Sequence, residues 1–197
     1  PLLLALNTEA ELWQIELLTG RTRQLATIKL PEWAPDHPVQ LIVSPCGRFA
    51  GVSKRKGKYA VIIELTSGTT ILSLERGEYH YEQSFYPLAF FMHNEQLLLA
   101  HGTDWNRLDL TLLFPEVKLL SERPIPDSRG ASDVEKAHYL DYFHGKLYAS
   151  PYGTYIAETG WIWMPVGLTR IWNNIEWLTN VWTTEDGDSL DSVWQPL

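Results

Sequence analysis

The chain has 197 residues, 45% hydrophobic and 20% charged, which is the composition of a folded globular protein with a sizeable core. Its net charge of −8 argues against nucleic acid as a partner, because binding phosphate needs a basic surface. The single cysteine, Cys46, excludes an intrachain disulfide framework. No segment approaches the ~18 apolar residues that span a membrane, so we expect a cytoplasmic protein that does not bind membranes.

Two short stretches nearly repeat each other 48 residues apart, namely Ile15–Gly20 and Ile63–Gly68. A third stretch, Ile175–Asn180, is a looser copy of the same pattern. An internal period of about 40 to 50 residues is typical of repeat architectures. The chain is therefore expected to be built from similar units.

The first unit contains three short apolar segments bounded by turn residues, which is the pattern of β-strands. These segments are Leu2–Leu6, Glu11–Leu17 and Arg21–Ile28. We expect them to be the last three strands of a four-stranded unit whose first strand is absent.

The second unit is the most regular. Its expected strands are Val39–Val43, Arg48–Ser53, Tyr59–Leu65 and Thr70–Leu74. Turn signals separate these strands, at Ser44-Pro45-Cys46-Gly47, Lys54–Lys58 and Thr66-Ser67-Gly68. Four antiparallel strands joined by tight turns make one blade of a β-propeller.

The third unit repeats the pattern. Its expected strands are Leu88–Met92, Gln96–Ala100, Arg107–Leu113 and Lys118–Ser121. The fourth unit is expected to open with a strand over His138–Phe143. It carries Ser150–Tyr155, which matches the earlier turn sequence Ser44–Phe49.

One segment of the fourth unit fits two structures. Apolar residues between Leu168 and Leu178 have the spacing of one face of a helix, with Thr169 as its N-cap. However, Trp172–Thr179 echoes Trp13–Thr19, which we expect to be a strand. We favour the strand because it agrees with the repeat.

The Ser-Pro-x-Gly turns, the Ile-Glu strand ends and the Thr-x-Gly turns together resemble a bacterial-style, degenerate WD-repeat β-propeller. The resemblance implies an all-β chain of four-stranded antiparallel blades and a single propeller domain or fragment. The blades would cover approximately 1–30, 39–77, 87–124 and 137–187, with a tail at 188–197. The sequence departs from the family pattern, because Cys46 and Tyr152 stand where Asp is usual and the Gly-His and Trp-Asp dipeptides are missing.

About four blades are visible, which leaves open how the ring closes. We expect first that the chain is a fragment of a larger ring, since it starts at Pro1 and ends just after Gln195-Pro196. Alternatively, Ser192–Gln195 supplies the missing strand beside Leu2–Leu6 and closes a four-bladed ring. In a third arrangement two copies join, so that an incomplete ring would self-associate.

The sequence contains no motif that points to a cofactor, a metal or a known catalytic elbow. The catalytic candidates are two acidic residues. Asp141 lies in the middle of an expected first strand, and Asp104 follows an expected second strand. A carbohydrate-active hydrolase or lyase with a site in the central channel is therefore the alternative function. Such chemistry needs two carboxyl groups that flank one glycosidic bond.

The favoured function is a non-enzymatic scaffold that binds another protein. The turn between the second and third strands and the loops between blades lie on one rim of a propeller, and here they mix basic and aromatic residues, a composition enriched at protein interfaces. The expected partner-binding residues are Lys54, Arg55, Lys58, Tyr79, Tyr81 and Trp105. Two later residues, Trp161 and Trp163, are expected in the core because they alternate along one strand.

Overall fold

The computed structural model describes residues 1–31, 33–34, 36–124, 138–163, 166–186 and 193–196. The described strands form four sheets, which we call A to D in chain order, and every strand pair is antiparallel. None of the helices in the described part of the chain has the length and apolar character that crossing a bilayer requires.

Within each sheet the strands pair in the order of the sequence. Sheet A contains β1 (Leu2–Leu6), β2 (Glu11–Glu16) and β3 (Thr22–Thr27). Sheet B contains β4 (Val39–Val43), β5 (Phe49–Lys54), β6 (Tyr59–Glu64) and β7 (Thr69–Glu75). Sheet C contains β8 (Leu88–His93), β9 (Gln96–Asp104), β10 (Arg107–Phe114) and β11 (Lys118–Leu119).

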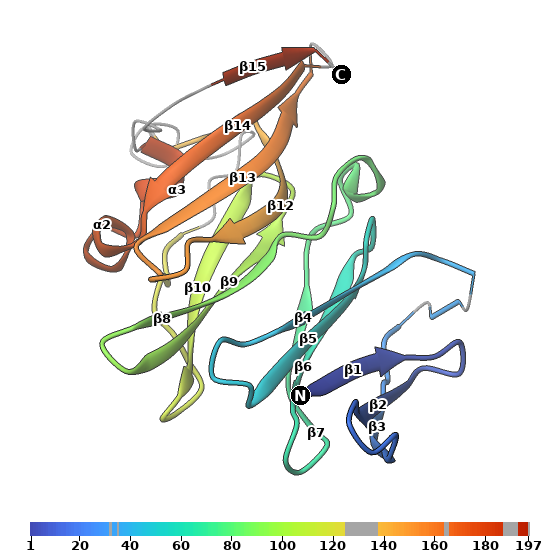
Figure 1. Ribbon diagram of the computed structural model, residues 1–197. Helices are drawn as coiled ribbons and strands as arrows, with labels where there is room; N and C mark the ends of the chain where they lie inside the picture. Colours follow the sequence, from blue (N-terminus) through green and yellow to red (C-terminus); the bar gives the residue numbers. More distant parts are fainter. Residues whose placement is uncertain (32, 35, 125–137, 164–165, 187–192, 197) are drawn as a thin grey trace.

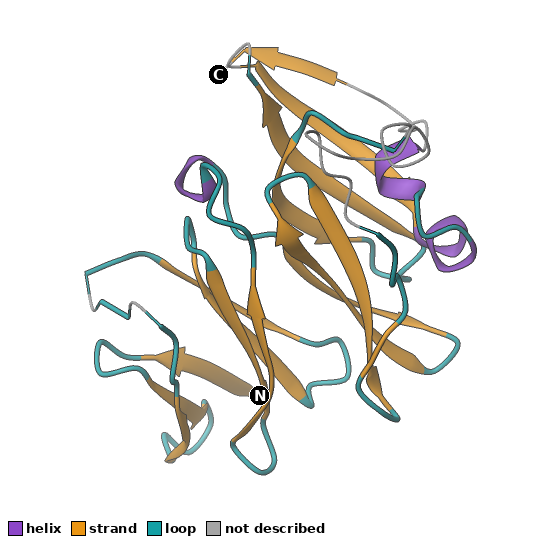
Figure 2. Ribbon diagram, turned by 180° about the vertical axis from the view of Figure 1, so that it is seen from behind, coloured by secondary structure: helices purple, strands orange, loops and turns teal. Residues whose placement is uncertain are grey.

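Sheet D contains β12 (Phe143–Ala149), β13 (Tyr155–Ile162), β14 (Val166–Asn173) and β15 (Val193–Pro196). The described helices are short: η1 (Tyr81–Gln83), α2 (Asn174–Thr179) and α3 (Thr183–Asp186). The sheets follow one another in an arc from A to D, and no closed ring is formed by the described residues (Figures 1 and 2). The expected all-β fold of antiparallel blades is confirmed.

The two Ser-Pro-x-Gly sequences form the same turn. Gly47 and Gly153 have φ angles of 69° and 68°, a left-handed conformation that favours glycine. In sheet B the Ser44 hydroxyl accepts a hydrogen bond from the amide of Phe49 at 3.0 Å. In sheet D the Ser150 hydroxyl accepts one from the amide of Tyr155, also at 3.0 Å. The repeated Ser-Pro-x-Gly sequence therefore forms the same hydrogen bond in both sheets.

The first two Ile-Glu repeats also share one structure. The Glu16 carboxylate accepts a hydrogen bond from the Thr19 hydroxyl, and the Glu64 carboxylate accepts one from Ser67, both at 2.6 Å. Gly20 ends the first turn at a φ of 69° and Gly68 ends the second at 70°.

The third copy does not follow this pattern, and the expected strand over Trp172–Thr179 is wrong. β14 ends at Asn173, whose side chain accepts a hydrogen bond from the amide of Ile175 and caps α2. The Asn174 amide group donates to the carbonyl of Gly153 at 2.8 Å, which fastens the helix start to the preceding hairpin. The alternative helix therefore forms, but with Asn173 as its cap, while Thr169 lies within β14.

Two further expectations for the fourth unit need correction. The stretch from His138 to Tyr142 is not a strand, because β12 begins only at Phe143. β15 pairs with β14 in sheet D, with Val193 opposite Thr169, so this segment does not complete sheet A beside β1.

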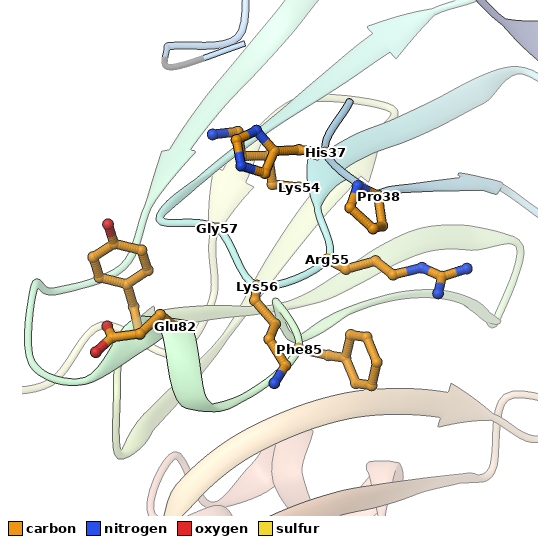
Figure 3. Close-up of a pocket in the computed structure, with 9 residues that line it drawn as sticks. His37, Pro38, Lys54, Arg55, Lys56, Gly57, Glu82 and Phe85 are labelled. Atoms are coloured by element: carbon orange, nitrogen blue, oxygen red, sulfur yellow. The ribbon is translucent and has the colours of Figure 1, made fainter. Parts of the chain in front are cut away.

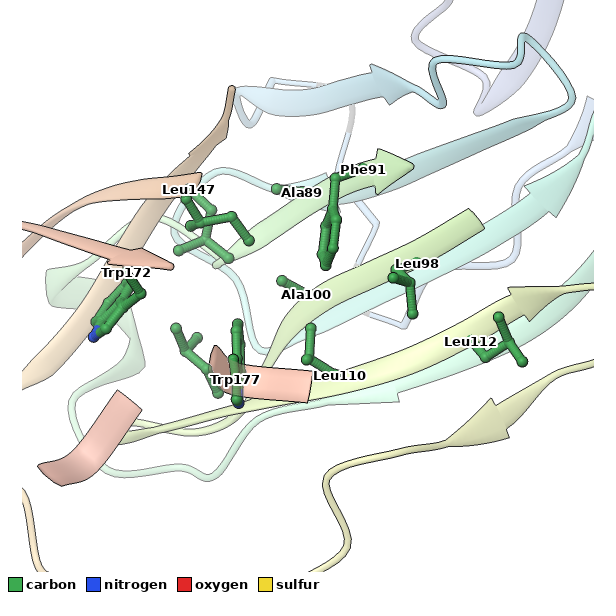
Figure 4. Close-up of a cluster of buried hydrophobic side chains, with 11 residues drawn as sticks. Ala89, Phe91, Leu98, Ala100, Leu110, Leu112, Leu147, Trp172 and Trp177 are labelled. Carbon is green, nitrogen blue, oxygen red and sulfur yellow. The ribbon is translucent and has the colours of Figure 1, made fainter. Parts of the chain in front are cut away.

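The sheets stack through three clusters of buried hydrophobic side chains. One lies between sheets A and B, one between B and C, and one between C and D. The last cluster also contains Trp172 of β14 and Trp177 of α2, each 1% exposed (Figure 4). Burial of this apolar surface is the main favourable contribution to stacking.

Sheets B and C bury apolar side chains on both faces. Along β8, Leu88 and Phe90 pack toward sheet B, whereas Ala89 and Phe91 pack toward sheet D. Along β6, residues 60 and 62 face sheet C and residues 61 and 63 face sheet A. Because successive strand residues point to opposite faces, each central sheet must have a neighbour on both sides.

The two glycines of the Ser-Pro-x-Gly turns offer a matched test of this stacking. A Cβ on Gly153 would lie 2.2 Å from the Met92 carbonyl oxygen of sheet C, whereas a Cβ on Gly47 would meet nothing within 4 Å. Gly47→Ala should cost about 1 kcal/mol through its positive φ alone. Gly153→Ala should cost about 2 kcal/mol more, since the backbone of sheet C must move. Urea unfolding measures both, and equal losses would contradict close contact of this turn with sheet C.

A buried polar cluster crosses sheet C. The Asp109 carboxylate accepts hydrogen bonds from Thr103 at 2.6 Å and Ser121 at 2.8 Å, and it pairs with Arg107 and Arg123. Burial alone would raise the pKa of Asp109, but these hydrogen bonds and the two positive charges outweigh it and hold the pKa below its usual value. The carboxylate therefore stays ionised inside the sheet.

His101 of β9 is buried beside this cluster, and its Nε2 lies 2.9 Å from the Thr111 hydroxyl. Burial lowers the pKa of His101 to about 4 from 6.5. Above pH 6.5 the His101 ring is neutral in both the folded and the unfolded chain, so it adds no pH dependence to the free energy of unfolding. As the pH falls from 6.5 toward 4, only the unfolded chain gains the proton, so stability decreases over this window.

We therefore expect His101→Gln to have a smaller loss of stability than the wild type between pH 7 and pH 4. The difference should reach about 3 kcal/mol, which is the free energy of the pKa change of His101. Urea unfolding across this pH range measures it, with His37→Gln as a control because His37 is exposed. Parallel pH profiles for wild type and His101→Gln would contradict the assignment.

Candidate functional site

A cluster of aromatic side chains joins three sheets at one rim. Tyr79 and His80 come from the β7–β8 loop of sheets B and C, and Trp105 comes from the β9–β10 turn. The remaining members belong to sheet D or the segment before it. We define the aromatic rim as Tyr79, His80, Trp105, Tyr139, Phe143, Trp161 and Trp163.

Phe143 is the centre of the aromatic rim and is buried. Its ring stacks on Trp161 with centroids 4.0 Å apart, and Trp105 lies 4.5 Å away on a tilted plane. Tyr79 contacts Trp105 at 5.2 Å, and His80 meets Trp163 edge-on at 5.0 Å. Offset and edge-to-face contacts at these distances are favourable, so the rings support one another.

Three rings of the aromatic rim remain open to solvent. Tyr79 is 48% exposed, Trp163 is 46% exposed and Tyr139 is 42% exposed. The expectation that Trp163 belongs to the core is wrong, because β13 ends at Ile162 and the alternation stops there. The result is a solvent-facing aromatic surface on a buried aromatic base.

A pocket of about 500 Å³ is lined by the β5–β6 turn and the β7–β8 loop, the loop that also carries Tyr79 and His80 of the aromatic rim (Figure 3). We call it the basic pocket, and its lining is His37, Pro38, Lys54, Arg55, Lys56, Gly57, Tyr81, Glu82 and Phe85. The β5–β6 turn supplies the cations, and η1 supplies Tyr81 and Glu82. Three of the six expected partner-binding residues, Lys54, Arg55 and Tyr81, therefore meet in this pocket, while Tyr79 and Trp105 lie in the aromatic rim.

Lys58 has a different environment from the other expected residues. Its ammonium group pairs with Glu75 and Glu78, each at 2.8 Å, and its side chain is 10% exposed. Hydrogen bonds from Lys58 to these two carboxylates raise the pKa of its amino group. Because Glu78 directly precedes Tyr79, this ion pair holds the start of the β7–β8 loop.

Arg76 organises both the loop and the pocket, and no pattern in the sequence singled it out. Arg76 is 1% exposed, and its guanidinium donates a hydrogen bond to the carbonyl of Gly57 in the β5–β6 turn at 2.9 Å. It also donates to the carbonyls of Tyr81, Ser84 and Phe85, at 2.6, 2.9 and 3.3 Å. Burial lowers the pKa of Arg76 to about 10, which still leaves it charged at neutral pH.

The two weak catalytic candidates do not line the basic pocket. Asp141 is exposed in the segment before β12 and does not lie in a first strand as expected. Asp104 ends β9, where its carboxylate accepts a hydrogen bond from the amide of Trp105 at 2.7 Å. In the described part of the chain, no three His, Cys, Asp or Glu residues gather in a way that could hold a metal ion.

Scans against models of protein families and against curated protein sequences gave no match. Among solved structures, Kuenenia stuttgartiensis hydrazine synthase matches with 11% identity and a TM-score of 0.55, over 98% of this chain and 48% of that chain. U3-55K matches with 13% identity and a TM-score of 0.49, over 99% and 48%. The Swd1 β-propeller domain of Myceliophteria thermophila matches with 11% identity and a TM-score of 0.46, over 89% and 54%.

The chain thus spans about half the length of the solved chains that it matches. At 11% identity, the likeness to the hydrazine synthase chain bears on the fold alone. The four stacked sheets, each with antiparallel strands in sequence order, have the architecture of β-propeller blades, so the fold is all-β and of the β-propeller class.

Replacing Arg76 tests its role in shaping the rim. Arg76→Lys keeps a positive charge, but one ammonium group cannot reach the Gly57 carbonyl of the β5–β6 turn and the Tyr81 carbonyl of the β7–β8 loop at the same time. We therefore expect a loss of about 3 kcal/mol in the free energy of unfolding. Arg48→Lys is the matched control, since Arg48 is an exposed residue that pairs with Glu64, and it should cost under about 1 kcal/mol. Urea unfolding compares them, and similar losses would contradict the role of Arg76.

Proposed function

We propose that this chain is a non-enzymatic scaffold of WD-repeat propeller type that binds another protein in the cytoplasm. It forms a single propeller domain or part of a larger ring, with blades near 1–30, 39–77 and 87–124 and a fourth blade that starts near 137 and includes β15 at Val193–Pro196. The observation that carries the proposal is the exposure of Tyr79, Tyr139 and Trp163 around a buried Phe143.

Aromatic side chains on a rigid base are the usual energetic centres of protein interfaces. The packed members of the aromatic rim limit the motion of the exposed rings, so a partner would lose little conformational entropy on binding. Lys58 contributes indirectly, because its pairing with Glu78 holds the loop that carries Tyr79. Lys54, Arg55 and Tyr81 extend the same surface into the basic pocket.

The chain has a second surface suited to protein contact. Leu2 and Leu3 of β1 are 64% and 48% exposed, and among the described strands only β2 pairs with β1. We include self-association through this edge of sheet A in the proposal. Light scattering after size exclusion measures it, and the substitutions Leu2→Ser and Leu3→Ser should reduce any dimer.

Partner capture tests the aromatic rim directly. Tagged wild type, Trp163→Ala and Tyr79→Ala are used to purify partners from an extract of the source organism, with quantitative mass spectrometry as readout. Each substitution should reduce recovery of a specific partner by about tenfold or more, because it removes a solvent-facing aromatic anchor.

Tyr152→Ala is the matched control for partner capture. Tyr152 is 90% exposed but lies in the β12–β13 turn, at the opposite end of the strands from Phe143. It should retain every partner. If Trp163→Ala and Tyr79→Ala also retain every partner while melting at the wild-type temperature, the proposal is wrong.

A further inference from the structure

The basic pocket has a charge opposite to that of the protein. Its lining contains three permanent cations, Lys54, Arg55 and Lys56, and one carboxylate, Glu82, in a chain whose net charge is −8. Arg55 and Lys56 are exposed at the tip of the β5–β6 turn. A local reversal of charge on an acidic protein steers ligands of negative charge toward that place.

These three cations are not used by the fold. Among the described residues, no side chain forms an ion pair or a hydrogen bond with the charged group of Lys54, Arg55 or Lys56. Lys58, four positions after Lys54 on the same turn, is neutralised by Glu75 and Glu78. The pocket therefore retains free cations next to one that is already satisfied.

The remaining lining is apolar or aromatic. Pro38, Phe85 and Tyr81 line the pocket together with the cations (Figure 3). Arg76 fixes this wall by donating hydrogen bonds to the carbonyls of Tyr81 and Phe85. A volume of about 500 Å³ is enough for a few side chains and falls in the range of ligand sites.

From this combination we infer that the basic pocket binds an acidic peptide segment of the partner, with Glu or Asp carboxylates on either side of an aromatic residue. The inference rests on the proposed function and adds the chemistry of the partner. The carboxylates bind Arg55, Lys54 and Lys56, and the aromatic ring packs on Phe85 and Pro38. Bidentate pairing with Arg55 fixes the orientation of one carboxylate.

The number of cations favours a peptide over other polyanions. Recognition of anionic lipid uses clusters of about four to eight Lys and Arg residues, and affinity for nucleic acid grows with each neutralised phosphate. The basic pocket has three cations next to Glu82. The pocket and the aromatic rim also share the β7–β8 loop, where Tyr79 and His80 of the rim are followed directly by Tyr81 and Glu82 of the pocket, and this arrangement fits an extended peptide.

Fluorescence anisotropy with labelled synthetic peptides tests the inference on the 197-residue chain. The probe is a short peptide of Glu and Asp residues around one Phe, and the matched peptide has Gln and Asn in their place. The acidic peptide should bind about tenfold more tightly than its neutral match at ~50 mM salt, and the difference should shrink as salt is raised.

Charge reversal identifies the site. Arg55→Glu and Lys56→Glu should each weaken the acidic peptide by about tenfold and leave the neutral peptide unchanged. Arg21→Glu is the control, because Arg21 is an exposed cation outside the pocket. Equal binding of the two peptides, or equal effects of Arg55→Glu and Arg21→Glu, would overturn the inference.

Two further probes separate the alternatives. Phosphatidylserine vesicles and single-stranded DNA are titrated against the same variants. Binding to either probe that depends on Arg55, without binding of the acidic peptide, would also overturn the inference in favour of that polyanion.

The proposed function and the inference can fail separately. If partner capture is lost in Trp163→Ala but kept in Arg55→Glu, the aromatic rim binds the partner and the pocket does not. If both variants keep all partners, the proposed function fails, and the peptide titrations alone decide what the pocket binds.

Discussion

The structure depends on the burial of two apolar faces by each central sheet. Sheets B and C have alternating hydrophobic side chains on both sides of the same strands, so neither sheet is stable unless it lies between two neighbours. The turns serve this stacking. Gly68 lies so close to the Leu25 carbonyl of sheet A that a side chain would not fit, and Gly153 approaches the carbonyl of Met92 in the same way.

Much of the fold could be predicted from local sequence because it resides in turns. The Ser-Pro-x-Gly turns close through contacts among neighbouring residues, such as the Ser44 hydroxyl with the amide of Phe49, and therefore keep their structure in both sheets. The Ile-Glu turns of sheets A and B behave similarly. Strand order follows from these turns, since each tight turn places consecutive strands side by side.

The fourth unit could not be predicted as well, because tertiary contacts decide its local structure. Asn174 is buried and donates a hydrogen bond to the carbonyl of Gly153, so a helix follows β14 although the sequence Ile175–Asn180 resembles the two earlier repeats. β15 joins sheet D across a long sequence separation from β14, and no local signal specifies that pairing.

In the candidate site, too, local features could be predicted from the sequence and tertiary contacts could not. The residue types on the loops were visible in the sequence, so Arg55 and Tyr79 could be selected as exposed loop residues, whereas Trp105 is half-buried. What each side chain contacts was not visible. Lys58 resembles its neighbours in sequence, but its ammonium group pairs with two carboxylates. Arg76 resembles an ordinary loop cation, but it is buried and donates five hydrogen bonds.

The aromatic rim has one consequence for the molecule as a whole, since its rings come from the edges of three sheets. Relative rotation of two neighbouring blades would change the spacing of Tyr79, Trp105 and Trp163. A ligand that fits the native spacing thus acts as a brace across the blades and raises the free energy needed to separate them. Binding at the aromatic rim, as proposed, would therefore stabilise the packing of the sheets against one another.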